Sequence, residues 1–465
     1  MKKKVIIIGA GIAGRLLEAD IKRNYQDCEV VGFIDDTNRP KIKILGKIAE
    51  IEGVLDRYKV DEVVIAIPSA EGSLVRRILQ INVNNRIPIR IVPREQRVIR
   101  HNDVQYKMVR DLTDEDWLGR PPLRTSIKRL ENFYQNKTVL VTGGAGSIGS
   151  EIVRQLLELK VKKVVVMDNS EFLVYALEQE LKEAKVKKTK FELMVGSVVD
   201  RRRTEEIIKK VKPGIVFHAA AYKHVHLMEQ CVGEAIKTNV LGTKNVVDAA
   251  MQQGVGKFVQ VSTDKAVNPA SVMGATKKLA ELYVQQRRST VTSFSIVRFG
   301  NVINSQGSVL PMFSRQVLER REVTVTDKRM ERYFMSIREA AQLVIMSATR
   351  MTQGAIYVLN MGDLISVNEV AQCVIRSHNL IPDKDVKIKV VGRRPGEKMV
   401  EELFAKDEKK LVSKTSLPNI WRLHNGVSAG KQNDDTVGHL QQLLKMTQNN
   451  ARIRAYLHTL FPTLK

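Results

Sequence analysis

One stretch near residue 140 restricts the possible folds more than any other part of the sequence. The apolar residues 139–141 lead into a turn at 143–149 that has the spacing G-x-x-G-x-x-G. A helical pattern follows, and a second apolar run, 164–167, ends in Asp168. Strand, glycine turn, helix, strand and acid in this order are typical of a Rossmann unit, in which backbone amides and a helix N-terminus hold a pyrophosphate. The sequence therefore predicts a parallel α/β sheet with a dinucleotide site at its carboxyl edge.

Asp168 indicates which dinucleotide this site takes. A carboxylate at the end of the second strand can accept hydrogen bonds from both hydroxyls of the adenosine ribose. No arginine adjoins Asp168 to hold a 2′-phosphate, so we expect NAD in preference to NADP. After the strand at 215–217, the small residues Ala219, Ala220 and Ala221 leave room for the cofactor to cross the sheet edge.

A second glycine turn lies near the N-terminus. Residues 9–14 fit the spacing G-x-G-x-x-G and follow an apolar run at 5–8, but this motif alone is weak evidence for a nucleotide site. Asp35 and Asp36 follow the next strand, about where a ribose-binding acid is expected. No side chains suited to catalysis come after them, so we favour a structural or regulatory role for this unit over productive nucleotide binding.

The two glycine turns divide the chain, which at 465 residues is too long for one ordinary core. Around 101–136 the periodicity fades, and Gly119-Arg120-Pro121-Pro122 cannot continue a helix. We predict an α/β protein with two Rossmann-like, doubly wound parallel-sheet domains, the second of which carries a smaller C-terminal substrate-binding lobe. The expected limits are 1–100 for the N-terminal domain, 101–136 for the linker, 137–410 for the second domain and 411–465 for a C-terminal helical extension.

The side chains best suited to chemistry follow an apolar strand of the second domain. Thr263, Asp264 and Lys265 present a hydroxyl, a carboxylate and an ammonium at its carboxyl end, where open parallel sheets bind ligands. The next helix places Met273 and Lys277 four residues apart on one face. This is the spacing of the Tyr-x-x-x-Lys pair of dehydrogenase-like Rossmann enzymes. Because a thioether cannot take or give a proton, proton transfer is expected to fall to the acid and the cations nearby.

Other charged residues extend this picture. Lys223 directly follows a buried-looking strand and is suited to a substrate or cofactor phosphate. Arg332 and Arg394 lie in basic loops where they can bind a pyrophosphate, although a solvated run of charge explains them equally well. His224 and His226 alternate as metal ligands can, but no carboxylate or cysteine completes a set, so no metal is expected.

Composition limits the possible partners. The formal net charge of +25 at pH 7 is compatible with a lysine-rich solvated surface, which we favour, and with peripheral association with anionic membranes. With 5% aromatic residues and no recognised binding motif, nucleic acid is not an expected partner. No apolar run is long enough to cross a bilayer and no signal peptide is visible, so we expect a cytoplasmic protein. Three well-separated cysteines fit reduced thiols.

Taken together, these motifs resemble those of the UDP-N-acetylglucosamine 4,6-dehydratases of capsule and polysaccharide biosynthesis, members of the extended short-chain dehydrogenase superfamily. The likeness covers 119–123 and extends from 138 to about 404. It rests on residues 142–149, 219–224, 262–265, 273–277, 298–302, 332–336 and 394–398. Long members of this family resemble one another in having methionine in place of the tyrosine. They also usually carry a transmembrane bundle before the first domain, so we expect a soluble form or a shortened chain.

The resemblance implies a reaction. NAD takes a hydride from sugar C4, a base removes the C5 proton, water leaves from C6, and the hydride returns to C6. The resemblance implies Lys265 as the base and Asp264 as the acid, while Lys277 holds the nicotinamide ribose. For the first step we hypothesise that Asp264 takes the O4 proton, directly or through Thr263 or a water. Lys265 can act as a base only if its pKa falls, and we hypothesise that Lys277 lowers it.

The residues expected at the site form three groups. The catalytic residues are Thr263, Asp264, Lys265, Met273 and Lys277. The NAD-binding residues are Thr142, Gly143, Gly146, Ser147, Ile148, Gly149, Asp168, Asn169, Ser197, Val198, Ala219, Ala220, Ala221, Lys223, Asn239, Lys277 and Val302. The substrate-binding residues are Lys223, Asn301, Gln306, Gly307, Ser308, Val309, Arg332, Arg394 and Glu397. We also expect a homo-oligomer that binds a UDP-sugar, and retention of configuration at C5.

Two alternatives remain open. A UDP-sugar 4-epimerase shares the glycine turn and Lys277 but needs no acid and base beside Thr263. A non-catalytic NAD-sensing or scaffold protein explains the loss of the tyrosine but not the presence of Asp264 and Lys265 beside Thr263. The sequence therefore favours the dehydratase first, the epimerase second and the sensor third.

Overall fold

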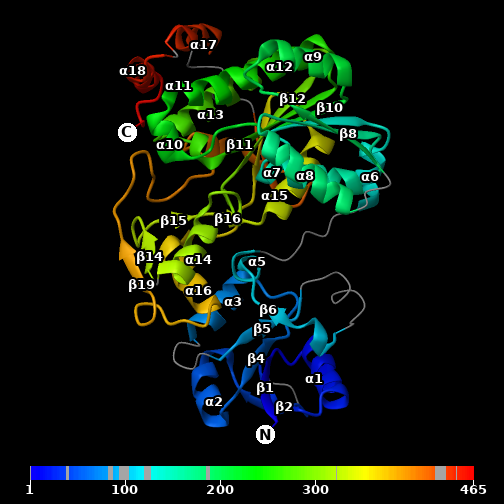
Figure 1. Cartoon of the computed structure of the whole chain (residues 1–465), viewed down its shortest axis with the longest axis vertical. Helices are drawn as coiled ribbons and strands as arrows, with labels where there is room; N and C mark the ends of the chain where they lie inside the picture. The colour runs from blue at the N-terminus through cyan, green and yellow to red at the C-terminus, as the bar shows by residue number, and fades with distance from the viewer. Residues whose placement is uncertain are drawn as a thin grey trace.

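The structure, a computed structural model, describes residues 2–37, 41–81, 87–93, 104–119, 127–184, 189–320, 322–424, 436–446 and 448–464. The described residues form two Rossmann-like domains with a smaller lobe between them, and in Figure 1 the N-terminal domain lies at the bottom in blue. The predicted α/β fold is confirmed. Of the stretch that sequence analysis places in the linker, Arg120, Pro121, Pro122 and Leu123 lie outside the described residues.

The N-terminal domain contains a six-stranded sheet in the order β3-β2-β1-β4-β5-β6. Its elements are β1 (Lys3–Ile8), α1 (Ile12–Asn24), β2 (Cys28–Ile34), β3 (Ile44–Gly46), α2 (Ile51–Tyr58), β4 (Glu62–Ile65), α3 (Gly72–Ile81), β5 (Ile89–Ile91) and β6 (Arg110–Asp111). α1 packs on one face of the sheet, and α2 and α3 pack on the other, which explains why β1 is apolar on both sides. Because β6 pairs antiparallel with β5, this domain continues past residue 100 into the predicted linker.

The second domain contains a nine-stranded sheet in the order β20-β21-β17-β12-β11-β10-β7-β8-β9. The parallel strands are β7 (Thr138–Thr142), β8 (Lys163–Asp168), β9 (Lys190–Val195), β10 (Ile215–His218), β11 (Lys257–Thr263), β12 (Ser293–Phe299) and β17 (Ala355–Leu359). The helices include α7 (Ser147–Glu158), α8 (Glu171–Glu183), α9 (Arg201–Val211), α12 (Thr243–Gln252), α13 (Val272–Gln286) and α15 (Ile337–Ser347). The strand order reverses between β7 and β10, and ligands bind at such a switch point in open α/β sheets.

The lobe is built from the segments that leave the carboxyl ends of β12 and β17. Its elements are β13 (Asn301–Val302), α14 (Val309–Arg320), β14 (Glu322–Val325), β15 (Glu331–Arg332), β16 (Phe334–Met335), β18 (Ile365–Ser366), α16 (Val367–Ser377) and β19 (Lys387–Val390). β14 pairs with β19 in parallel, while the shorter strands form the pairs β13 with β16 and β15 with β18. The lobe therefore faces the carboxyl edge of the large sheet.

The N-terminal domain and the lobe share one hydrophobic core. Ile78 of α3 and Trp117 of the linker helix α5 (Asp114–Leu118) belong to the same buried cluster as Phe313 of α14 and Val374 of α16. Trp117 is fully buried in this cluster. The predicted linker thus contributes a structural side chain, and the two parts bury apolar surface against each other rather than moving as separate bodies on a tether.

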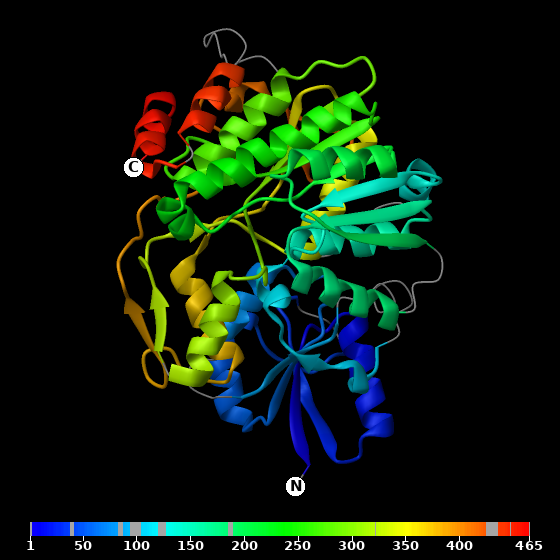
Figure 2. The same ribbon diagram turned by 45° about the horizontal axis from the view of Figure 1, so that its top comes forward.

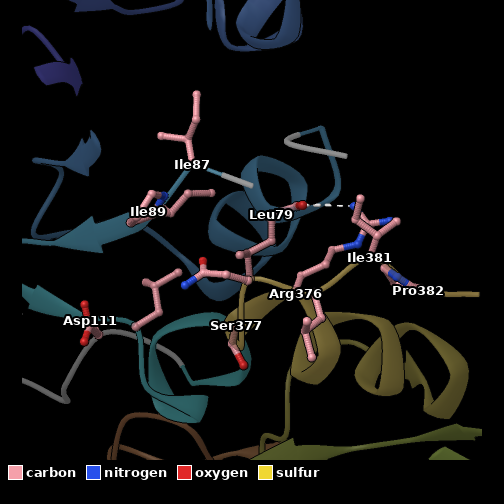
Figure 3. A pocket seen from close by; sticks show the side chains of 12 residues that line it. Leu79, Ile87, Ile89, Asp111, Arg376, Ser377, Ile381 and Pro382 are labelled. Atoms are coloured by element: carbon pink, nitrogen blue, oxygen red, sulfur yellow. Dashed lines mark hydrogen bonds between the residues drawn. The ribbon is translucent and has the colours of Figure 1, made fainter. Parts of the chain in front are cut away.

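Polar contacts close the same junction. Arg76 Nε pairs with Glu369 Oε1 at 2.9 Å across it. Arg376 Nη1 donates to the carbonyls of Leu79 and Gln80 at 3.0 and 2.7 Å, which satisfies the C-terminal end of α3. A cavity of about 130 Å³ lies beside Arg376 and is lined from both sides of the junction (Figure 3). Arg376 therefore stabilises the junction between the N-terminal domain and the lobe.

Residues 411–465 are not wholly helical, contrary to the prediction. β21 (Ile420–Leu423) pairs antiparallel with β17, and β20 (Val412–Lys414) pairs with β21. Such short strands carry too few residues for hydrophobic periodicity to separate them from helix. Two helices do follow, α17 (Thr436–Lys445) and α18 (Asn450–Leu460), and they pack on the second domain (Figure 2, red). Within the described ranges, no helix is long and apolar enough to cross a membrane.

Candidate active site

The glycine turn of the second domain brings β7 and β10 into close backbone contact. Gly143 has φ +65°, and a Cβ there would lie 2.5 Å from the backbone nitrogen of Ala220. A Cβ on Gly149 would lie 2.1 Å from the carbonyl oxygen of Gly143. Both positions therefore require glycine, and the turn leaves the N-terminus of α7 open toward the sheet edge.

Asp168 is held in place at the end of β8. Its Oδ2 accepts a hydrogen bond from the backbone N–H of Ala145 at 3.1 Å, and its Oδ1 accepts one from Ser170 at 3.0 Å. Buried but bordering the adjoining cleft, the carboxylate stands where sequence analysis expects the ribose-binding acid. This arrangement suits recognition of two ribose hydroxyls.

The N-terminal glycine turn has the same local geometry. Asp35 Oδ2 accepts from the backbone N–H of Ala10 at 2.7 Å, and Asp35 Oδ1 accepts from Thr37 at 2.8 Å. Gly9 has a positive φ of +101°, and Gly143, the first glycine of the other turn, also has a positive φ. The turn of the second domain lies beside a large cleft.

This cleft has a volume of about 640 Å³ and follows the carboxyl edge of the sheet from β8 to β12. Most of the residues expected to bind NAD line it. They are Gly143, Gly146, Ser147, Ile148, Gly149, Asp168, Asn169, Ser197, Val198, Ala219, Ala220, Ala221, Lys223, Lys277 and Val302. The size, the glycine cradle at a helix N-terminus and the acid at the far end together fit a dinucleotide.

Two of the expected NAD-binding residues lie behind the cleft wall instead. The Thr142 hydroxyl shares a hydrogen bond of 2.7 Å with Nδ1 of His218, a residue whose pKa burial lowers to about 3. Asn239 is fully buried and holds the backbone of Tyr222, accepting from its N–H at 2.8 Å and donating to its carbonyl at 3.0 Å. Both residues support the lining without bordering the cleft in this structure.

The end of β11 brings three proton-carrying groups together. The Thr263 hydroxyl donates to Asp264 Oδ1 at 2.9 Å, and Lys265 Nζ donates to the same oxygen at 3.1 Å. Thr263 and Lys265 line the cleft, whereas Asp264 is fully buried beneath them. Burial raises the pKa of Asp264 by more than the Lys265 ammonium lowers it. The carboxylate therefore meets the cleft through the hydroxyl and the ammonium of its neighbours.

The helix α13 places Met273 and Lys277 on the wall of the same cleft, as their spacing predicts. Ser271 caps this helix, because its hydroxyl accepts from the backbone N–H of Gly274 at 3.1 Å. Lys277 Nζ donates to the carbonyl of Val261 at 2.9 Å. Burial lowers the pKa of Lys277 to about 8, so this amine is poised between its charged and neutral forms.

The expectation that Lys277 lowers the pKa of Lys265 is wrong. Burial does lower the pKa of Lys265, but the carboxylates of Asp264 and Glu401 raise it by more, so it lies above its ordinary value. Arg332, rather than Lys277, is the cation that opposes them. The sequence could not reveal this balance, because Glu401 reaches Lys265 only through the tertiary fold.

A second cavity, of about 260 Å³, lies between the end of β11 and the lobe. Most of the expected substrate-binding residues line it: Lys223, Asn301, Gly307, Ser308, Val309, Arg332, Arg394 and Glu397. Lys223 and Lys265 border both this cavity and the larger cleft, so the two spaces meet at these lysines. Partial burial lowers the pKa of Lys223, which borders both cavities.

Two predicted residues have further roles in this structure. Arg332 donates to the carbonyls of Lys398 and Met399 at 2.7 and 3.0 Å, so its guanidinium is committed to the lobe backbone. Gln306 lines the larger cleft, and its backbone N–H donates to the Ser147 hydroxyl at 3.0 Å. This last contact fastens the loop after β13 to the glycine turn.

Comparison with known proteins identifies relatives of this chain. The family model described as "Polysaccharide biosynthesis protein" matches residues 139–425, and one described as "CoA-binding domain" matches residues 1–93. The chain is 37% identical over 418 residues to the capsular polysaccharide biosynthesis protein CapD of Staphylococcus aureus, which spans 88% of this chain and 69% of CapD.

Two named enzymes are similar over the second domain. A UDP-N-acetylglucosamine 4,6-dehydratase (inverting) of Campylobacter jejuni is 33% identical over 60% of this chain and 81% of the enzyme. A UDP-glucose 4-epimerase of Rickettsia rickettsii is 33% identical over 59% of this chain and 80% of the enzyme. Both activities considered from the sequence therefore occur among the relatives.

Proposed function

The chain belongs to the polysaccharide biosynthesis protein family, as its motifs predicted, and from this premise we propose that it catalyses the NAD-dependent 4,6-dehydration of UDP-N-acetylglucosamine. The observation that carries the proposal is the cluster of Thr263, Asp264 and Lys265, whose lysine borders both cavities. A dehydration needs an acid and a base beside the sugar, and Met273 supplies neither. The 4-keto-6-deoxy product is an intermediate suited to surface polysaccharide synthesis.

NAD is proposed for the larger cleft. When bound, NAD accepts a hydride from sugar C4 and supplies it to C6. The glycine turn would hold the pyrophosphate, and Asp168 would accept from the adenosine ribose hydroxyls. Lys277 would hold the nicotinamide ribose, since it lines the same cleft beside β11.

Thr263 and Asp264 are proposed to move the O4 proton. The hydroxyl of Thr263 borders the cleft and already donates to Asp264 Oδ1, so a proton taken from O4 by the threonine oxygen can pass to the carboxylate. Because burial raises the pKa of Asp264, this carboxylate is a better proton acceptor than an exposed aspartate. The protonated acid can then return its proton to the C6 hydroxyl, which leaves as water.

Lys265 is proposed as the base at C5. In its neutral form it takes the C5 proton, and as ammonium it returns a proton to C5 after C6 has been reduced. Its raised pKa means that the ammonium predominates before substrate binds. Once Asp264 has accepted the O4 proton, one of the two neighbouring carboxylates is neutral, which lowers the stability of the ammonium and lets it release its proton to water. The order of the proton transfers thus prepares Lys265 for its step.

Incubation with UDP-N-acetylglucosamine in deuterated water, followed by NMR, tests the proposal. We expect a 4-keto-6-deoxy product that carries deuterium at C5, with no net change in NAD. A 4-epimer would instead establish the second candidate, a UDP-sugar 4-epimerase, which the similarity to the Rickettsia enzyme favours. If neither product forms, a non-catalytic role for the cleft is the remaining candidate.

Retention of configuration at C5 is part of the proposal, although the similar Campylobacter dehydratase is named as inverting. For product formed in ordinary water, nuclear Overhauser contacts between H5 and the other ring protons distinguish the two configurations. Homo-oligomerisation and peripheral membrane association stay predictions from the sequence.

A further inference from the structure

A buried glutamate outside the predicted site shares the proton-carrying cluster. Glu401 follows β19 in a segment tied to the lobe by the Glu331 N–H, which donates to the Met399 carbonyl at 3.0 Å. The Glu401 side chain is 3% exposed and borders the second cavity, between β11 and the lobe. Buried carboxylates are costly unless they are paired, so its partners indicate what it does.

The main partner of Glu401 is Lys265. Lys265 Nζ lies 3.4 Å from Glu401 Oε1, 3.1 Å from Asp264 Oδ1 and 2.9 Å from Asn301 Oδ1. Arg332 Nε lies 3.7 Å from the same Glu401 oxygen. The second oxygen, Oε2, is buried and has no hydrogen-bond partner among the residues that the structure describes. The negative charge of Glu401 therefore acts on the site mainly through its attraction to Lys265.

The charged groups around this pair come from several elements. Asp264 belongs to the segment that follows β11, Arg332 to β15, and Lys398 to the segment that carries Glu401. Burial raises the pKa of Glu401, but the cations Lys265, Arg332 and Lys398, with Lys265 foremost, lower it by more. The carboxylate is thus a second anion beside the Lys265 ammonium, in addition to Asp264.

We propose that Glu401 is a positioning residue, whose carboxylate holds Lys265 at the boundary of the two cavities and sets the pH above which Lys265 is a neutral base. This inference rests on the proposed dehydration. Glu401 gains and loses no proton in the cycle. Its charge stabilises the Lys265 ammonium that forms when the C5 proton is removed.

The variant Glu401→Gln tests this role, with Glu402→Gln as the matched control, because Glu402 is adjacent in sequence but half-exposed. The measurements are kcat and KM for UDP-N-acetylglucosamine from pH 6 to 10, and the rate of C5 deuteration. In Glu401→Gln we expect the acidic limb of the kcat profile to move down by about one pH unit or more, because the ammonium loses an anion. The plateau should fall by roughly tenfold, while KM changes by less than about threefold.

A profile that keeps its acidic limb at the wild-type pH, with only a lower kcat or a higher KM, would overturn the inference. Transient NADH formation should stay within about threefold of wild type, since the first hydride transfer does not use Lys265. If wild type gives no dehydration product, the proposed function fails. If wild type dehydrates and the profile of Glu401→Gln is unmoved, only the role of Glu401 fails.

Glu401→Asp guards against a variant that does not fold. It retains the charge but shortens its reach, so the acidic limb should lie between those of wild type and Glu401→Gln. The pH dependence of Lys265 acylation in the wild-type protein, followed by mass spectrometry, is a second measurement. Lys265 should become reactive at a higher pH than the exposed Lys409, and the reverse order would contradict the proposal.

Discussion

Arg454 Nη2 lies 2.5 Å from Glu229 Oε2, while the other oxygen of the same carboxylate accepts the backbone N–H of Val272 at 2.7 Å. Arg454 belongs to α18, and Val272 is the first residue of α13. A C-terminal segment without chemistry of its own thus supports the helix that carries Met273 and Lys277.

Replacing Arg454 by alanine should therefore weaken both stability and the site. The change leaves the buried Glu229 carboxylate without its cation, at a cost of about 1–3 kcal/mol in the free energy of unfolding. Urea denaturation measures this loss, and NAD titration measures its effect on the cleft. Arg452→Ala, an exposed change in the same helix, is the control and should lose less than about 0.5 kcal/mol. Equal losses of stability in the two variants would show that the pair of Arg454 and Glu229 has no special role in stability.

The two glycine turns offer a matched pair of variants for the NAD site. Asp168→Ala should weaken NAD binding by about 10–100-fold, because hydrogen bonds to a charged acceptor are each worth about 1.5–3 kcal/mol. Asp35→Ala removes a carboxylate with the same backbone contacts but should leave NAD affinity unchanged. Isothermal titration with NAD decides the matter. Comparable losses in both variants would place a cofactor in each domain.

The relay from Thr263 to Asp264 predicts a loss that already appears at the first proton transfer. Asp264→Asn and Thr263→Val should each slow transient NADH formation by about 100-fold or more, since each breaks the path from O4 to the carboxylate. Thr263→Ser keeps the hydroxyl and should remain within about tenfold of wild type. Single-turnover absorbance of the reduced nicotinamide follows the step. Normal NADH formation by Asp264→Asn would rule out this assignment.

The lowered pKa of Lys277 predicts that the stability of the fold depends on pH. Its pKa is about 8 in the folded chain and ordinarily 10.5, so between these values the unfolded chain binds more protons. Stability relative to Lys277→Met should therefore rise as pH increases through this window, by about 3 kcal/mol in total. Below about pH 7 the difference should be flat. Denaturation of both proteins from pH 6 to 10.5 measures it, and a difference that falls with pH would contradict the assignment.

Local patterns were sufficient for the dinucleotide cleft. Gly143, Gly149 and Asp168 lie within one βαβ unit, so their spacing already specifies which groups meet. The same holds for Met273 and Lys277, which a single helix brings to one wall. In such cases the geometry follows from helix and strand periods alone.

Long-range contacts were beyond the sequence. Glu401 meets Lys265 only because the segment after β19 returns over the end of β11, and no period connects positions so far apart. The burial of Asp264 beneath Thr263 likewise depends on how the lobe covers the strand end. An acidic pair at Glu401 and Glu402 just after a basic loop was the one available signal, but solvated charge runs look the same.

The apolar cluster that joins Ile78 and Trp117 to Phe313 and Val374 bears on any attempt to dissect the protein. A fragment that begins at β7 would keep the glycine turn, Thr263, Asp264 and α13, yet it would expose to water the face of the lobe that packs on the N-terminal domain. Such a fragment should self-associate unless those apolar residues are replaced by polar ones. In the intact chain, the first hundred or so residues therefore shield apolar surface that the remainder would otherwise turn toward solvent.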